Sequence, residues 1–468
     1  MRFSHRHPWR ATTVLSLSLA LTPGAHAQAQ PPADDMVVTG TLLPVPKREI
    51  GTAVSVIDAA EIVLRGYDGL ADLLRTQPGI GVTNTGGLGK ATSLRIRGEE
   101  GYRTQLIIDG VKAVDPSGAH VSPDFDSLLA TDDLERVEIL RGPQGFIYGA
   151  DAGGVVNLMT RRGSGPAGGR VSVETGSFDT RRINANASGG TDRGDYYVSF
   201  NDFVTDGINS QTADIALRDR DGARNKTWHT KLGLNLDNDW RLQLVAHNVD
   251  ARTQYDGCFH PITFAIVHDC VGTTDQTTYR ISAEQSGEKL THAFGYSDTD
   301  IRHDNRSQGA DAFASHGQLG RFEYTGSYRP AKGQTLIYGL DLQDERVVAD
   351  ESQQRDQNAL YVEYEGELAK GVFFTAGTRR DDNDDFGAHT SSRVSLAVVR
   401  ALRDGDTLKY RASYGTGFRA PSLYEIAYNR GPSSYPPAAG FVLGPEASKG
   451  YDVGLEDRKS TRLNSSHT

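Results

Sequence analysis

The sequence lacks the features that assign a chain to several common classes of protein. After the first 27 residues it has no run approaching the roughly 18 apolar residues that a membrane-spanning helix needs. Its net charge of −10 argues against a general nucleic-acid binder, which presents a basic face. The motifs G-x-S-x-G, H-E-x-x-H and C-x-x-C are absent, so no catalytic signature supports a secreted hydrolase. Methionine is scarce, with three residues, whereas 52 glycines and 19 tyrosines favour strands and turns over helices.

The first 27 residues have the organisation of an export signal. Arginines lie near the start, residues 14–21 form a short apolar run, and the sequence Ala-His-Ala ends at Ala27. A charged start, an apolar middle and a small-x-small end are typical of a secretory signal peptide, which is removed from the mature protein. We therefore predict that residues 1–27 are cleaved and that the mature chain is exported.

Only two cysteines are present, Cys258 and Cys270, in the segment CFHPITFAIVHDC. No further cysteine and no zinc-like spacing of histidines accompanies them. In an exported chain such a close pair predicts a disulfide rather than a metal site.

Residues 36–162 alternate short strands with helical patches. In the segment LADLLRTQPGI, residues 70–80, apolar residues at positions 70, 73 and 74 are followed by a Pro-Gly stop, which predicts a short amphipathic helix. The segments SLRIRG and QLIIDGV have the composition of short strands, and the second contains the turn signal Asp109-Gly110. This region is predicted to be a compact α/β unit.

From residue 163 onward, apolar and polar residues alternate with a period of two. In the segment WHTKLGLNL, for example, Trp228 and Leu232 lie on one face of an extended chain, and His229 and Lys231 lie on the other. Segments of this kind, separated by polar turns, predict antiparallel strands with one apolar and one polar face.

Two architectures fit this alternation. A large secreted β-sandwich or propeller would pack its apolar faces together. An outer-membrane barrel would turn its apolar face to lipid and its polar face to the lumen. The barrel accounts for the mean hydropathy of −0.47, since only every second residue is apolar, and it places the tyrosines in aromatic girdles. The polar residues 302–317 fit a long extracellular loop of such a barrel.

Residues 50–162 contain, in order, the segments LADLLRTQPGIGV, SLRIRG, LIIDGV and LERVEILRGPQGFIYGADAGGVVNLMT. This series resembles the plug domain of TonB-dependent outer-membrane transporters. Later segments, RRDDNDDFG, ASYGTGFRAPSLYEI and GPEASKGYDVGLE, resemble barrel motifs of the same family. Together these segments extend over nearly the whole mature chain.

The resemblance implies a mainly β fold, in which an N-terminal α/β plug domain, residues 45–162, lies inside a transmembrane antiparallel β-barrel. Family barrels have about 22 strands, and residues 163–456 have room for roughly 12 to 15, so only part of a barrel is expected. The alternating pattern stops at residue 456. Because residues 457–468 resemble no barrel strand, we expect a C-terminally truncated chain with a non-native tail.

The implied function is that of a bacterial outer-membrane receptor that actively imports a scarce, large ligand, and not that of an enzyme. The chain most resembles the cobalamin transporters of the family, so cobalamin is the expected ligand, and a ferric siderophore or haem importer is the alternative. A passive porin would need no plug domain. The expected partners are the energy-coupling protein TonB, the imported ligand and outer-membrane lipid, with no nucleic acid.

Glycines at positions 142, 145, 149, 153 and 154 punctuate the last of the plug segments. A phosphate loop requires G-x-x-x-x-G-K-[ST], and the nearest approach, GGLGKAT, has Ala91 after its lysine. We expect a turn in a crowded lumen, where glycine permits close backbone approach. We also expect Arg136 and Arg141 to pair with carboxylates of the barrel wall.

The resemblance places the TonB-contacting segment shortly after the signal peptide, within a linker over residues 28–44. An extended, β-branched peptide on a mobile tether suits recognition by strand addition. The expected contact residues are Met36, Val37, Val38, Thr39 and Gly40.

For ligand contact, the resemblance points to two apical loops of the plug, in which many dispersed contacts hold a large ligand. The expected residues are Thr85, Gly86, Gly87, Leu88, Gly89, Lys90, Ser117 and Gly118.

In the cobalamin transporters, aspartates on neighbouring extracellular loops hold calcium, and this chain has oxygen-bearing residues at similar places. Calcium takes six to eight oxygen ligands in flexible geometry. The expected ligands are Asn209, Asp219, Asp221, Asp256 and Asp269. Asn209 stands where the family commonly has Asp, so one charge is missing, and a Cys258–Cys270 bridge would rigidify the second loop.

Overall fold

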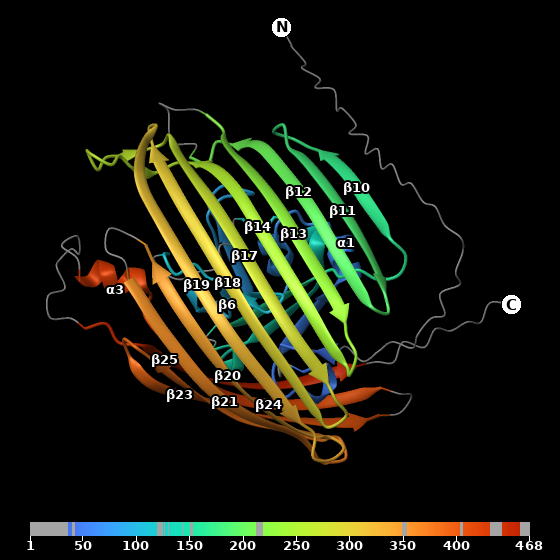
Figure 1. Cartoon of the computed structure of the whole chain (residues 1–468). Coiled ribbons are helices and arrows are strands. Elements are labelled where there is room, and N and C mark those ends of the chain that lie inside the picture. Colours follow the sequence, from blue (N-terminus) through green and yellow to red (C-terminus); the bar gives the residue numbers. More distant parts are fainter. Residues whose placement is uncertain are drawn as a thin grey trace, which may run out of the picture.

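The computed structural model describes residues 36–39, 43–118, 125, 127–129, 131–143, 145–149, 153–211, 219–348, 353–402, 406–430 and 442–458. The predicted signal peptide, Gly40 and residues 459–468 lie outside the described residues. Within them, a small N-terminal α/β domain lies in the concave side of a large curved sheet (Figure 1).

The N-terminal domain is built on a five-stranded sheet with the order β3-β8-β9-β6-β7, in which only β6 and β9 run parallel. Two further antiparallel pairs, β1-β2 and β4-β5, accompany it. The elements are β1 (Met36–Val37), β2 (Val45–Pro46), β3 (Val54–Asp58), α1 (Ala59–Arg65), α2 (Leu70–Arg75), β4 (Ile80–Asn84), β5 (Thr92–Ile96), β6 (Thr104–Ile108), β7 (Val111–Lys112), β8 (Leu134–Arg141) and β9 (Gly154–Thr160).

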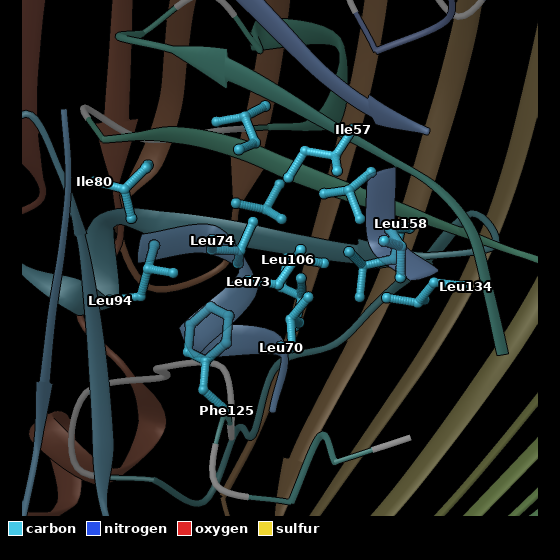
Figure 2. Packing of buried hydrophobic residues seen from close by; sticks show 14 of the residues in the cluster. Ile57, Leu70, Leu73, Leu74, Ile80, Leu94, Leu106, Phe125, Leu134 and Leu158 are labelled. Atoms are coloured by element: carbon cyan, nitrogen blue, oxygen red, sulfur yellow. The ribbon is translucent and has the colours of Figure 1, made fainter. Parts of the chain in front are cut away.

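Helix α2 supplies much of the core of this domain. Leu70, Leu73 and Leu74 lie on one face of the helix and are buried against the sheet (Figure 2). Burial of each leucine contributes roughly 1.5–3 kcal/mol. The helix ends at Arg75, before the predicted Pro-Gly stop. The physical reason is that Pro78 disfavours helical backbone in the residue before it, and Gly79 then adopts a left-handed φ of 73°.

The predicted turn at Asp109-Gly110 is confirmed. Both residues have positive φ, 48° and 86°, and they join β6 to β7 as an antiparallel hairpin.

The large sheet contains fourteen antiparallel strands among the described residues, each paired with its neighbours in the sequence apart from an inserted β15-β16 hairpin. The strands are β10 (Gly168–Thr175), β11 (Arg181–Thr191), β12 (Gly194–Ile208), β13 (Asp221–Asn235), β14 (Trp240–Tyr255), β17 (Cys270–Ser286), β18 (Leu290–Ser307), β19 (Ala310–Tyr328), β20 (Gln334–Val347), β21 (Gln353–Ala369), β22 (Val372–Asn383), β23 (Gly387–Ala401), β24 (Thr407–Arg419) and β25 (Glu446–Arg458), with β15 (Cys258–Phe259) and β16 (Ile266–Val267) in the insertion. One helix, α3 (Leu423–Arg430), lies between β24 and β25.

Strand β25 extends beyond the predicted end of the alternating pattern at residue 456. Asp457 and Arg458 pair with Leu408 and Thr407 of β24, so the sheet includes these two residues. In the part of the chain that the structure describes, no helix is long and apolar enough to cross a membrane.

The two faces of the large sheet decide between the two predicted architectures. In β13, His229 and Lys231 face the N-terminal domain and are 1% and 7% exposed, whereas Trp228 and Leu232 face away and are 53% and 40% exposed. A sandwich or propeller would bury its apolar faces, so the observed arrangement excludes both. An apolar outer face and a polar inner face are what a transmembrane β-sheet requires.

The connections differ between the two ends of the large sheet. At one end, the long-loop end, strands are joined by long segments such as 256–269 and 420–445. At the other, the short-turn end, they are joined by short turns such as 192–193 and 370–371.

The prediction of a long loop over residues 302–317 is wrong. These residues continue β18 and β19 to a tight turn at Gln308-Gly309. The two strands have 18 and 19 residues, while about 9–11 residues cross a bilayer. Their ends extend into water, and this explains the polar composition of the segment.

Candidate functional site

A cavity of about 510 Å³ lies at the long-loop end, between the N-terminal domain and the large sheet. The loop that joins β4 to β5 lines one side with Thr85 and Lys90. Strands β14, β17 and β18 line the other side with mostly polar side chains, among them Tyr255, Thr274 and His303. Such a cavity provides many separate polar contacts for part of a large molecule.

Asn84, which the sequence analysis did not single out, shapes the β4-β5 loop. Its Oδ1 accepts the N–H groups of Gly86 and Gly87 at 2.9 and 2.5 Å, and its Nδ2 donates to the Gly87 carbonyl at 2.8 Å. Asn is a preferred residue for such turns because its side chain mimics the backbone. The segment NTGG therefore could have predicted this turn from the sequence. The turn presents Thr85 to the cavity.

The other predicted ligand-contact residues of this loop lie beside the cavity. Gly87, Leu88 and Gly89 line a second cavity of about 250 Å³, together with residues of α2. A side chain on Gly86 would overlap Ser210 Oγ in the connection after β12, so glycine permits the close approach there.

Ser117 and Gly118 do not line the cavity of about 510 Å³. The Oγ of Ser117 donates to Asp115 Oδ1 at 2.6 Å and lies 3.1 Å from Ser315 Oγ in β19. Asp115 Oδ2 lies 3.1 Å from Nε2 of His303, which does line that cavity. The predicted loop is packed against the wall of the sheet, and His303 connects it with the cavity.

Lys90 enters the wall of the sheet from the β4-β5 loop. Its side chain is 2% exposed, and its ammonium donates hydrogen bonds to three oxygen atoms of β13 and β14. Burial lowers the pKa of Lys90 to about 8, while the carboxylates of Asp221 and Asp256 act in the opposite direction.

Of the five predicted calcium ligands, Asp219 and Asp221 act on Asp256. Burial raises the pKa of the Asp256 carboxyl above its usual range, and Asp221 and Asp219 add to that rise. The Oδ1 of Asn209 accepts a backbone N–H of its own loop, and Asp269 is exposed.

Within the described ranges, no group of three or more His, Cys, Asp or Glu side chains has the arrangement to hold a metal ion. Calcium stays a prediction from the resemblance.

Cys258 and Cys270 form the predicted disulfide. It closes the connection between β14 and β17 directly after Asp256, and the β15-β16 hairpin lies inside the closed loop.

The N-terminal segment lies toward the opposite, short-turn end. Met36 and Val37 form β1, which pairs with β2. Val37 and Thr39 are fully buried, and Val37 belongs to one hydrophobic cluster with Ile337, close to the start of β20.

The glycine-rich stretch turns the chain where the backbone is crowded. Gly154 has a φ of 121°, and any side chain on it would overlap the Leu140 carbonyl of the neighbouring strand. Gly149, with a φ of 67°, ends the short turn before β9. Only glycine adopts both conformations without strain.

The prediction that Arg136 and Arg141 pair with carboxylates of the barrel wall is wrong. Arg136 pairs with Glu138 at 2.7 Å, and Arg141 Nε donates to the Pro78 carbonyl at 3.0 Å. Both arginines lie in β8, which is flanked by β3 and β9, so their partners come from the N-terminal domain itself.

Two family matches extend over most of the chain. Residues 46–156 match the TonB-dependent Receptor Plug Domain, and residues 166–466 match the TonB dependent receptor-like beta-barrel. The chain belongs to the TonB-dependent receptors. The N-terminal domain is the plug domain, the large sheet belongs to the barrel region, and the protein is located in the bacterial outer membrane.

Among curated proteins, the chain is similar to the vitamin B12 transporter BtuB of Photobacterium profundum, with 26% identity over 95% of this chain and 71% of the relative. The vitamin B12 transporter BtuB of Vibrio vulnificus is 25% identical over the same shares.

Among solved structures, the ferric enterobactin receptor PfeA of Pseudomonas aeruginosa has a TM-score of 0.70 and 20% identity, covering 85% of this chain and 65% of that receptor. The siderophore receptor PirA of Acinetobacter baumannii has a TM-score of 0.71 and 19% identity, over 88% of this chain and 69% of that one. At these identities the structural likeness bears on the fold alone. The chain spans about two thirds of the length of the proteins it resembles.

Proposed function

We propose that this receptor binds a large, scarce ligand in the cavity at the long-loop end and imports it with energy that TonB delivers at the short-turn end. The observation that carries the proposal is that the cavity and the N-terminal segment lie toward opposite ends of the large sheet. Outer-membrane barrels have long loops outside the cell and short turns in the periplasm. The cavity then opens to the medium, and the N-terminal segment lies on the side where TonB acts.

We assign TonB contact to residues Met36, Val37, Val38, Thr39 and Gly40. The pairing of β1 with β2 supports this assignment, because it holds Met36 and Val37 in the extended conformation that strand addition requires. Since Val37 and Thr39 are buried against the plug, the segment has to detach before another protein can pair with it.

Cobalamin is the ligand that we propose first. The support is that curated relatives over 95% of this chain are vitamin B12 transporters. A ferric siderophore is the second candidate, because the similar solved structures are receptors for ferric enterobactin and other siderophores. Haem is a third candidate from the sequence resemblance. Calcium is not part of this proposal, because the Lys90 ammonium already donates to three oxygen atoms that lie within three residues of Asp221 or Asp256 in the sequence.

Binding titrations with the purified full-length protein test the proposed ligand. Cyanocobalamin, ferric enterobactin and haem are each added while the intrinsic tryptophan fluorescence is recorded. We expect cyanocobalamin to bind with a Kd of about 1 μM or tighter, near −8 kcal/mol, and the other two to bind at least tenfold more weakly. Tighter binding of ferric enterobactin would reassign the ligand to the siderophores, and no binding of any of the three would contradict the proposal.

A further inference from the structure

The side chain of Lys90 crosses from the plug into the wall of the large sheet. Its Nζ donates to the Gly222 carbonyl at 2.8 Å, to Thr253 Oγ1 at 2.9 Å and to the Gln254 carbonyl at 2.6 Å. An ammonium has three N–H donors, so each has a partner. The acceptors come from the first residues of β13 and the last residues of β14, so one side chain joins the plug to two neighbouring strands at the long-loop end.

Two carboxylates act electrostatically on this ammonium. Asp221 directly precedes Gly222 and is almost fully buried, and its Oδ2 accepts the Ser210 N–H at 2.7 Å. Asp256 directly follows β14. Among the described residues its buried Oδ1 has no hydrogen-bond partner, and Nδ1 of His268 lies 3.8 Å from it. Buried carboxylates that lack a nearby cation are costly, because water no longer solvates their charges.

Close packing holds the lysine in this place. Gly89, with a φ of 74°, approaches β13 so closely that a side chain on it would lie 2.7 Å from Ala223 Cβ. A side chain on Gly222 would lie 2.9 Å from Gln254 Oε1. The positive φ and the close contact of Gly89 fix the loop against β13, so the fold itself inserts the Lys90 side chain between the strands.

The oxygen atoms around Lys90 are of the types that coordinate a hard divalent cation. Backbone carbonyls, hydroxyls and carboxylates are ordinary calcium ligands, at about 2.3–2.6 Å from the metal. In this chain the ammonium uses two carbonyls and one hydroxyl, at 2.6–2.9 Å, and its charge opposes those of Asp221 and Asp256.

We propose that Lys90 is a built-in cation that takes the place of a divalent metal ion at the long-loop end, so that this receptor anchors its plug loop to β13 and β14 without calcium. The inference does not depend on which ligand is imported. The positive charge of Lys90, which is covalently part of the chain, takes the place of the calcium predicted from the sequence. Lys90 is thus a positioning residue that holds the wall of the cavity.

The variant Lys90→Met tests the proposal, because it removes the charge and keeps most of the aliphatic stem. The oxygen atoms then lose the lysine charge, and calcium can enter. We expect the wild-type protein to have the same thermal unfolding midpoint in calcium and in chelator. For Lys90→Met we expect a lower midpoint in chelator, a recovery in calcium, and an affinity for calcium at least tenfold higher than that of the wild type. Calorimetric titration with calcium alone measures the affinity.

Two further variants separate this role from general destabilisation. Lys231→Met removes another buried lysine between sheet and plug, which bonds Asp109 at 2.8 Å, and it should lower the midpoint equally in calcium and in chelator. Lys90→Met combined with Asp256→Asn should bind calcium at least tenfold more weakly than Lys90→Met alone, because one of the two carboxylates is lost.

Three results would overturn the proposal. The first is a calcium-induced rise in the midpoint of the wild type that equals that of Lys90→Met. The second is a Lys90→Met protein that is indifferent to calcium. The third is a Lys90→Met protein that fails to fold even with calcium present, because the metal was expected to replace the ammonium.

Discussion

Thr39 is bound to Glu138 by two hydrogen bonds to one carboxylate oxygen: its backbone N–H and its Oγ1 donate to Glu138 Oε2 at 2.8 and 2.6 Å. The N–H of Val38 reaches the same oxygen at 3.0 Å. Thr39 and Glu138 are both fully buried, and Glu138 lies in β8 of the plug sheet. Glu138 therefore fastens the proposed TonB-contacting segment to the plug, together with Arg136, which donates to the Met36 carbonyl, and Asn157, which donates to Thr39 Oγ1 at 3.1 Å. Detachment of the segment breaks the three charge-assisted hydrogen bonds to Glu138.

The variant Glu138→Gln should loosen this segment without changing the plug core. The amide keeps the shape of the carboxylate but loses its charge, and hydrogen bonds to a charged group are worth about 1.5–3 kcal/mol each. A spin label on Met36→Cys should become more mobile in the absence of ligand, as recorded by electron paramagnetic resonance. Glu135→Gln, an exposed position on the same strand, is the matched control. Equal label mobility in Glu138→Gln and in the control would show that the carboxylate does not hold the segment.

The variant Thr85→Trp should weaken ligand binding at least tenfold, about 1.4 kcal/mol, because the indole ring occupies space in the cavity of about 510 Å³. Thr83→Trp places the same ring on the same plug hairpin, at an exposed position that does not line this cavity. Titrations of both variants with the ligand that binds the wild type measure the difference. Equal affinities for the two variants would place the binding site elsewhere.

Lys112 should make the stability of the protein depend on pH in the alkaline range. It is buried in β7, its Nζ donates to Gln343 Oε1 at 2.9 Å, and burial lowers the pKa of Lys112 from 10.5 to about 8. Above pH 8 the folded protein releases this proton, whereas the unfolded chain keeps it up to about pH 10.5. The free energy of unfolding therefore rises with pH between these two values. Below pH 8 the buried lysine is charged in the folded protein, and its burial destabilises the fold to the full extent.

The variant Lys112→Met removes this contribution. From pH 8 to pH 10 the wild type should gain roughly 2–3 kcal/mol of unfolding free energy relative to Lys112→Met, as measured by denaturant titration at both pH values. Lys370→Met, at an exposed position in a short turn, should behave like the wild type. If the unfolding free energies of the wild type and of Lys112→Met change with pH in the same way, Lys112 is not the source of the pH dependence.

Much of the fold was predictable because it rests on local patterns. The alternation of Trp228 and Leu232 with His229 and Lys231 defined the two faces of a strand before its partners were known, and the spacing of Leu70, Leu73 and Leu74 predicted α2. The error at residues 302–317 arose because polar composition does not distinguish a loop from strand ends that extend into water. The positions of Arg136 and Arg141 depended on the strand order of the plug, which local patterns do not encode.

The candidate site was predictable only in part, since its contacts join residues that are far apart in the sequence. Thr85 and Lys90 were placed in the correct loop, yet the acceptors of Lys90 lie 132 to 164 residues away, in strands whose register the sequence does not specify. The same holds for Glu138, which binds a segment about 100 residues earlier and was not singled out. For Ser117, the composition indicated an apical loop, but its packing against Ser315 became apparent only in the assembled structure.

Energised import through the N-terminal segment is tested most directly by ligand uptake in living cells that carry Val37→Pro. Proline removes the backbone donor that strand pairing needs, whereas Val37→Ala keeps it and serves as the matched control. With radiolabelled ligand, Val37→Pro cells should bind ligand at the surface like the wild type but take up no more than cells that lack TonB, while Val37→Ala cells should retain uptake. Normal uptake by Val37→Pro cells would contradict the account.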